Sequence, residues 1–435
     1  MSFSIKIGLY IAFGVLVILA ILMALGVITP FKSAPTSGSL IIWDVGDRKR
    51  AFSALLEQYR GAFPNVKITY EAKDPGTYKE ELLDALAAGQ GPDIFVLQND
   101  EILDQKNKLS PLPIGASQAK AFLEKMPDAV MGDLTDDENI YGVPLFVDTL
   151  ALYYNKDHLN AANIPAAPTT WEEFQDQSKR LTRTLPGGEI IRSGASFGTA
   201  KNVEHAAEIF YALLLQTGNP IFTSRDAKFH LSDRAETSTG DEPAGVSALN
   251  FYTSFANPRS PFYTWNSTLP GSRGSFADGR AAFYIGYARD FNYILGKNPH
   301  LNFGVSRLPQ LNADSRISYA SYQFLTVAKN SQSPALAWTF LLAMAEPSMS
   351  DAISKALLLP PANRDLAVKG PSNKILKPFY DQVLSAKSWL IFSRGTVAAI
   401  FRDMLDSVAE KSVAPESALG RAQSQLSTLA QDRAQ

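Results

Sequence analysis

The sequence predicts an α/β protein of two lobes that the chain crosses several times. The first observation behind this prediction is an alternation of patterns after residue 39. Apolar strand patterns alternate with amphipathic helical patterns, in the order 40–43, 49–63, 66–71, 77–88 and 93–97. Such alternation favours a mostly parallel sheet, in which ligands gather at the carboxyl ends of the strands.

The second observation is an apolar, strand-like run at residues 143–154 that contains a single carboxylate, Asp148. Turn-forming residues delimit the run on both sides. Burying an unpaired carboxylate is very costly, so Asp148 needs a basic partner or a polar ligand. We therefore expect this segment to pass between two lobes.

Two later segments are expected to complete the connections. Residues 303–309 followed by 319–328 have the pattern of a return crossing, and a third crossing is expected to begin at 357–361. Between the crossings the pattern is more helical, and Thr170 with Glu173 forms a capping box at the start of one helix. The predicted architecture is two α/β lobes, each assembled from discontinuous segments and joined by three connections.

Composition excludes several classes of protein. The chain has 435 residues, of which 46% are hydrophobic, so it is long enough to bury a sizeable core. Its formal net charge is −2, with no basic footprint for nucleic acid. It contains no cysteine, which removes disulfides, thiolate catalysis and cysteine-based metal sites.

The sequence contains no recognisable motif for catalysis or metal binding. The four histidines are scattered without zinc-ligand spacing, at positions His158, His205, His230 and His300. The sequence has no GxSxG elbow and no phosphate-loop lysine, and the acidic run at 133–138 lacks EF-hand spacing and is interpreted as a solvated surface turn. A carboxylate pair for glycoside hydrolysis stays open, because such a pair can come from distant segments. We predict no catalytic residues, no metal and no cofactor.

The amino-terminal segment predicts a membrane anchor. Residues 7–28 carry no charge and are almost continuously apolar, which is long enough to cross a bilayer as a helix. A cleavable signal peptide would have a shorter apolar core and a small-residue cleavage motif, whereas Ala34 is followed here by Pro35. A retained anchor at 1–30 is therefore favoured over a cleaved signal, with a short flexible tether at 31–38.

Several motifs together resemble the extracellular solute-binding proteins that serve ATP-binding cassette (ABC) importers, in particular family 1, the sugar-binding branch that includes maltose-binding protein. Besides the run around Asp148, the motifs are LIIW at 40–43 with GDR at 46–48, GQGPDIF at 89–95, TTWEEF at 169–174 and GRAAFYIG at 279–286. The resemblance covers most of the chain after residue 38. It implies a two-lobed periplasmic-binding-protein type II fold with a three-segment hinge, here preceded by the transmembrane helix.

On this basis the first lobe is expected to comprise residues 39–147 and 321–365, and the second lobe residues 148–320 and 366–435. The resemblance also implies ligand-binding positions at the carboxyl ends of strands in the first lobe. The first of these positions are Asp47 and Arg48, for which the alternative to ligand binding is an exposed turn with a helix-capping aspartate. The others are Gln98, Asn99 and Asp100, for which the alternative is an Asx-type turn before the helix.

In the second lobe, the resemblance implies that Asn202, Glu204 and His205 face the cleft and that Tyr287 and Arg289 follow a turn beside the sugar. Relatives commonly place a tryptophan at this turn, whereas this chain has Tyr287-Ala288. The replacements considered for a stacking ring are Trp265 and Trp389. Asp148 matches a carboxylate that contacts sugar hydroxyls in maltose-binding relatives. The alternative to this binding role is that Asp148 is buried in an ion pair with Arg289 or Arg48.

The predicted function is a solute receptor that binds an uncharged carbohydrate between its lobes and delivers it to the permease subunits of an ABC importer. The expected protein is a monomer, binds no nucleic acid, and is held at the cell membrane with its folded part on the extracytoplasmic side. The alternatives are a receptor for a polyamine, peptide or metal complex, a secreted glycosidase-like enzyme on a similar scaffold, and an orphan sensor ectodomain.

The anchor leads to a first prediction. Because residues 7–28 are long and uncharged and the chain has no cysteine for lipidation, the protein should fractionate with membranes, whereas a version starting near Ser39 should be soluble. Cell fractionation followed by amino-terminal sequencing measures this. A mature amino terminus between Ser33 and Ser39 would contradict the prediction.

Overall fold

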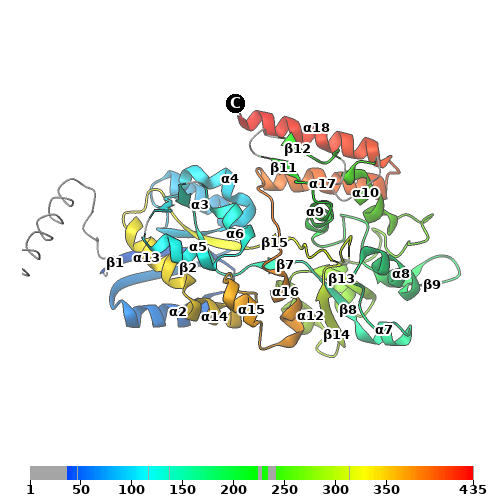
Figure 1. Cartoon of the computed structure of the whole chain (residues 1–435), viewed down its shortest axis with the longest axis horizontal. Helices are drawn as coiled ribbons and strands as arrows, with labels where there is room; N and C mark the ends of the chain where they lie inside the picture. The colour runs from blue at the N-terminus through cyan, green and yellow to red at the C-terminus, as the bar shows by residue number, and fades with distance from the viewer. Residues whose placement is uncertain are drawn as a thin grey trace, which may run out of the picture.

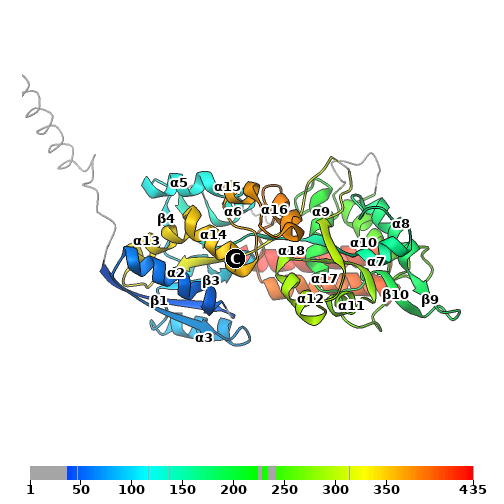
Figure 2. The ribbon, with the colours of Figure 1, turned by 90° about the horizontal axis from the view of Figure 1, so that it is seen from below.

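A computed structural model describes residues 37–434, except 47, 116, 137, 224–227, 234–241 and 313. The described residues form two lobes side by side along the long axis, each built on a five-stranded sheet (Figures 1 and 2). No helix in this part of the chain is long and apolar enough to cross a membrane. The expected anchor at 1–30 and Asp47 lie outside the described residues.

The sheet of lobe 1 has the strand order β2-β1-β3-β16-β6. The bounds are Asn65–Lys73 for β2, Ser37–Val45 for β1, Ile94–Gln98 for β3, Gln323–Val327 for β16 and Val143–Pro144 for β6. The strand β1 is parallel to β2 and β3, as the alternating pattern predicts, whereas β16 runs antiparallel to both β3 and β6. Helices cover this sheet: α2 (Lys49–Ala62), α3 (Tyr78–Ala87), α4 (Ile102–Gln105), α5 (Ser117–Lys125), α6 (Asp128–Leu134), α13 (Pro334–Ala345) and α14 (Pro347–Leu357).

The sheet of lobe 2 has the order β14-β8-β13-β10-β9. The bounds are Phe303–Arg307 for β14, Ala151–Asn155 for β8, Ala281–Gly286 for β13, Ile190–Ala195 for β10 and Arg183–Thr184 for β9. Only β10 and β13 are parallel, so this sheet departs from the mostly parallel arrangement predicted. Its helices are α7 (Lys156–Ala161), α8 (Trp171–Leu181), α9 (Ala206–Gln216), α10 (Ala244–Ser254), α11 (Ser272–Ala277), α12 (Phe291–Lys297), α17 (Arg394–Ala409) and α18 (Pro415–Ala434).

Three chain segments run side by side between the lobes. The strand β7 (Asp148–Thr149) pairs antiparallel with β15 (Ala320–Ser321), so the predicted boundaries at 148 and 321 fall in these strands. Lys387 lies beside them, because Ala320 N donates to Lys387 O and Lys387 N donates to Ser318 O, at 2.9 and 2.8 Å. The predicted third segment, 357–361, contacts the first crossing just before β7 begins, through a β-bridge between Pro361 and Phe146.

The helices α15 (Arg364–Lys369) and α16 (Lys377–Gln382) lie between the lobes (Figure 2). They precede the third crossing, which leads up to α17 and α18 on lobe 2 (Figure 1). The remaining strands form two short pairs, β4 (Leu112–Pro113) with β5 (Asn139–Ile140), and β11 (Phe222–Thr223) with β12 (Lys228–Phe229).

The capping box predicted at Thr170 is present. The Thr170 hydroxyl accepts from Glu173 N at 3.2 Å, and the Glu173 carboxylate accepts from the backbone of Thr169 and Thr170. It starts α8, which packs Trp171 and Phe174 into the core of lobe 2.

The contact between α8 and β10 gives a second prediction. A Cβ added at Gly194 of β10 would lie 1.8 Å from the carbonyl oxygen of Ser178, so Gly194→Ala must push the helix off the sheet. We expect a loss of about 1–3 kcal/mol and a lower melting temperature in a thermal melt. Gly187→Ala is the control, because nothing lies within 4 Å of its added Cβ. Equal melting temperatures for the two variants would contradict this packing.

Candidate functional site

A cavity of about 820 Å³ lies between the lobes. Lobe 1 contributes Lys79 of α3 together with Asp100 and Glu101, which belong to the short helix η1 (Asn99–Glu101) directly after β3. Lobe 2 contributes the loop before α9, the first turns of α9, the residue before α11, and α17 with the segment before it: Ala200, Lys201, Asn202, Val203, Glu204, His205, Ala206, Ala207, Glu208, Tyr211, Gly271, Ile391, Arg394, Gly395, Ala398 and Arg402. Four residues predicted from sequence therefore line the cavity: Asp100, Asn202, Glu204 and His205.

Asp100 connects the two lobes across this cavity. Its Oδ2 lies 2.7 Å from Arg394 Nε, whereas its buried Oδ1 has no hydrogen-bond partner among the described residues. Burial raises the pKa of Asp100 to about 7, against the opposing charge of Arg394. One oxygen of Asp100 is thus paired with Arg394, the other has no partner among the described residues, and the charge of this carboxyl group changes near neutral pH.

Two further cavity residues have polar groups that find no partner within the part of the chain that the structure describes. Glu208, in the first turn of α9, is half-buried and forms no hydrogen bond or ion pair with the described residues. The buried hydroxyl of Tyr211 likewise has none there. The Tyr211 ring is fixed edge-on against Trp389, with ring centroids 5.3 Å apart. Glu208, Tyr211 and Arg394 could not be predicted from the sequence, because no local motif distinguishes them.

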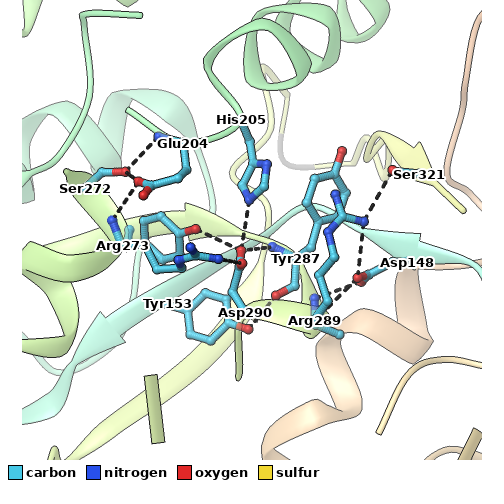
Figure 3. Close-up of polar contacts among 12 residues, drawn as sticks. Asp148, Tyr153, Glu204, His205, Ser272, Arg273, Tyr287, Arg289, Asp290 and Ser321 are labelled. Atoms are coloured by element: carbon cyan, nitrogen blue, oxygen red, sulfur yellow. Dashed lines mark hydrogen bonds and ion pairs between the residues drawn. The ribbon is translucent and has the colours of Figure 1, made fainter. Parts of the chain in front are cut away.

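Asn202 and Glu204, by contrast, are occupied by internal contacts. Asn202 Nδ2 donates to the carbonyl oxygens of Asn266 and Leu269, and its Oδ1 accepts from Trp265 Nε1 at 3.0 Å. The Glu204 carboxylate accepts from the Ser272 hydroxyl, and from Arg273 N at 2.9 Å (Figure 3). These two side chains hold the loop that forms one wall of the cavity.

His205 also takes part in a buried network, centred on Asp290 (Figure 3). Asp290 is 1% exposed and contacts His205 Nε2 at 3.0 Å, Arg273 Nη1 at 3.0 Å and the Tyr284 hydroxyl at 2.8 Å. Burial alone would raise the pKa of Asp290, but the contact with His205 and the charge of Arg289 hold this pKa well below its ordinary value. The network fixes the start of α9 against the loop after β13.

Asp148 is fully buried where the first crossing enters lobe 2. It accepts hydrogen bonds from the backbone N–H groups of Ala288 at 2.8 Å and Arg289 at 3.1 Å, and the Arg289 guanidinium lies 3.7 Å away (Figure 3). Burial raises the pKa of Asp148 to about 6, with Arg289 opposing the shift. The structure therefore favours the alternative in which Asp148 pairs with Arg289, and direct contact with a ligand stays a prediction.

Arg289 extends this pair toward lobe 1. Its guanidinium lies over the Tyr287 ring at 3.8 Å and donates to Ser321 Oγ at 3.3 Å. Ser321 Oγ also accepts from Gln98 Nε2 at 3.0 Å. Tyr287, Arg289 and Gln98 thus line the junction of the lobes rather than the cavity.

Asn99 and Asp133 form a second buried network in lobe 1. Asn99 Nδ2 donates to Asp133 Oδ2 at 3.1 Å, and Asp133 also accepts from the hydroxyls of Tyr322 and Ser388, both at 2.8 Å. Burial raises the pKa of Asp133 to about 6. The expected surface turn at 133–138 is therefore wrong for Asp133, which is buried and holds the third crossing through Ser388.

Arg48 and the two tryptophans do not line the cavity. Arg48 forms a buried ion pair with Asp44, which also accepts from the Tyr70 hydroxyl at 2.7 Å. Trp265 and Trp389 are 1% and 6% exposed and belong to the core of lobe 2, so neither presents a face for stacking on a ligand.

Among the described residues, no group of His, Asp and Glu is placed to hold a metal ion.

The Asp290 network gives a third prediction. A lowered folded pKa means that this carboxylate stabilises the fold above pH ~4 and loses its contribution as the pH falls below that value. Asp290→Asn should lower the stability at pH 7 by about 3 kcal/mol, and should flatten the loss of stability as the pH falls from about 4 to about 2. Melting curves across this range measure both effects.

The control is Asp403→Asn, which removes an exposed carboxylate whose one ion pair among the described residues is with Lys411. It should leave the melting temperature at pH 7 nearly unchanged. If Asp290→Asn and Asp403→Asn melt alike, the buried network does not contribute as described.

Comparison with known proteins agrees with this geometry. The family of bacterial extracellular solute-binding proteins matches residues 54–376. The galactooligosaccharide-binding protein of Bacillus subtilis is 24% identical over 310 residues, covering 69% of this chain and 68% of that protein, and its maltodextrin-binding protein is 27% identical over 313 residues, covering 68% and 69%. The crystal structure of the cyclic α-maltosyl-1,6-maltose binding protein of Arthrobacter globiformis shares the fold, with a TM-score of 0.77 at 18% identity over 91% of this chain and 100% of that one. The chain therefore belongs to the bacterial extracellular solute-binding proteins, as its sequence motifs predicted.

Proposed function

We propose that this chain binds an uncharged saccharide in the cavity between its lobes and delivers it to the permease subunits of an ABC importer. The observation that carries the proposal is the cavity itself, which both lobes line with polar groups that have no partner in the described part of the chain. Its volume lies within the range of about 300–1,000 Å³ usual for small-molecule sites.

The unpartnered groups suit a ligand rich in hydroxyls. Each hydroxyl both donates and accepts a hydrogen bond. Asp100 Oδ1 and the Glu208 carboxylate supply acceptors, while the Tyr211 hydroxyl and the exposed Arg402 supply donors. The first turns of α9 and α17 also border the cavity, and the N–H groups at a helix start lack intrahelical partners.

Binding would be completed by closure of the lobes. The three adjacent crossings provide a place about which the lobes can move, as in other hinge-closing proteins. The Arg394–Asp100 ion pair spans the lobes at the cavity, so its geometry depends on their separation. A saccharide that contacts both lobes would favour the closed arrangement.

The relatives described above are named as binding proteins for galactooligosaccharide and maltodextrin, which supports a saccharide rather than a peptide or a metal complex. We further propose that residues 1–30 anchor the protein, as a monomer, in the cell membrane with both lobes on the extracytoplasmic side. The solute should be bound without chemical conversion.

Glu208 gives the fourth prediction. Because it makes no internal polar contact with the described residues, Glu208→Gln should leave the melting temperature of the free protein unchanged. It should weaken saccharide binding by about tenfold, since hydrogen bonds to a charged group contribute about 1.5–3 kcal/mol. Calorimetric titration with maltotriose, maltodextrin and a galactooligosaccharide measures the affinity, and chromatography of the recovered saccharide tests whether it is unchanged.

Glu204→Gln is the matched control. Its carboxylate is held by Ser272 and by the backbone of Arg273, so this change should lower the melting temperature of the free protein. Unchanged affinity in Glu208→Gln would remove Glu208 from the site. Sustained hydrolysis of the saccharide by the pure protein would contradict a receptor function.

A further inference from the structure

The C-terminal helix α18 reaches from lobe 2 to lobe 1. It packs on α17 and α10 of lobe 2, and its last turns extend toward the α4 side of lobe 1 (Figure 1). Near its end, Arg433 Nη1 donates to Asp104 Oδ1 of α4 at 2.7 Å, and Arg433 Nη2 donates to the carbonyl oxygen of Leu103. The same guanidinium lies 5.4 Å from the ring centroid of Phe392 in lobe 2.

Asp104 binds lobe 2 at a second point. Its other oxygen, Oδ2, accepts from the backbone N–H of Ser393 at 2.8 Å. The neighbouring Leu103 packs against the hydrophobic cores of both lobes. One short helix of lobe 1 is therefore joined to lobe 2 by an ion pair, a backbone hydrogen bond and an apolar contact.

These contacts lie beside the candidate ligand site but outside it. Ser393 directly precedes Arg394, whose ion pair with Asp100 spans the cavity. Asp104 and Arg433 instead line a separate, more open hollow together with Lys106 and Tyr141. Changing them would therefore alter how the lobes are held together without removing a group that lines the cavity.

We propose that Arg433 and Asp104 form an interlobe latch that favours the closed arrangement of the lobes and thereby raises the affinity of the cavity for its ligand. The part concerning affinity rests on the proposed function. The side chains of Arg433 and Asp104 are 38% and 26% exposed, and an ion pair of this exposure shifts an equilibrium by about two- to fivefold. Since only the closed form holds the ligand from both sides, the apparent affinity follows the closed population.

The latch can be measured without a ligand. Because the chain has no cysteine, spin labels can be placed on the full chain through Lys120→Cys in α5 of lobe 1 and Lys179→Cys in α8 of lobe 2, both exposed. Pulsed electron paramagnetic resonance then gives the distribution of distances between the lobes. We expect the ratio of long to short interlobe distances to be about two- to fivefold higher in Arg433→Ala and in Asp104→Asn than in the spin-labelled chain without these substitutions.

Two controls separate a latch from general loosening of the fold. Arg433→Lys keeps a positive charge and should restore much of the short-distance population. Arg421→Ala removes an exposed arginine of the same helix and should leave the distribution unchanged. A distribution in Arg433→Ala identical to that of the unchanged chain would overturn the proposal, as would an equal shift in Arg421→Ala.

Titration with maltotriose tests the link to affinity. Arg433→Ala should raise the dissociation constant by about the factor seen in the distance ratio. A shifted distance ratio with an unchanged dissociation constant would overturn the link between latch and affinity. If the unchanged chain fails to bind any of the saccharides tested, the proposed function fails, and the distance measurement still decides whether the latch exists.

Discussion

Asp148 lies fully buried where the chain first passes between the lobes, and the arrangement around it depends on how that charge is satisfied. A buried carboxylate without partners would be very costly, so the fold must bring donors to it. They come from the loop after β13, about 140 residues further along the chain, where two backbone N–H groups and the Arg289 guanidinium face Asp148. Because Arg289 also reaches Ser321, and Ser321 reaches Gln98, one buried charge connects the first crossing, the second crossing and the end of β3.

The same principle separates the polar residues of the cleft into two groups. Asn202, Glu204 and His205 have internal partners and build the walls of the cavity. Asp100 Oδ1, Glu208 and the Tyr211 hydroxyl are left without partners among the described residues, although they lie in or beside the same cavity. Leaving a buried polar group unpaired costs free energy, which a bound ligand would offset, so these groups support a ligand-binding role for the cavity.

The features of the fold that depend on local patterns were predictable from the sequence. The strands and helices at the start of lobe 1, the capping box at Thr170 and the position of the first crossing follow from periodicity and turn residues. The motifs also identified the family. The antiparallel pairings of β16 with β3 and of β8 with β13 and β14 were not predictable in this way, because they join segments more than 100 residues apart.

The candidate site was predictable only in part, for the same reason. Asp100 lies two residues after the end of β3 and could be singled out by its position, but its partner Arg394 lies on a helix near the other end of the chain. A sequence shows that Trp265 and Trp389 are large and apolar, but not that the core of lobe 2 encloses both. Likewise, Asp133 stands in an acidic run typical of a surface turn, yet the contacts with Asn99, Tyr322 and Ser388 bury it.

The central claim is that the cavity between the lobes holds a saccharide. A crystal structure of the protein with a saccharide selected by thermal-shift screening tests this claim most directly, since a ligand that binds the folded state raises its melting temperature. We expect electron density for the sugar between the lobes, with hydroxyls within hydrogen-bond distance of Asp100 and Glu208. A sugar bound elsewhere on the protein, or a sugar in the cavity that contacts neither carboxylate, would contradict it.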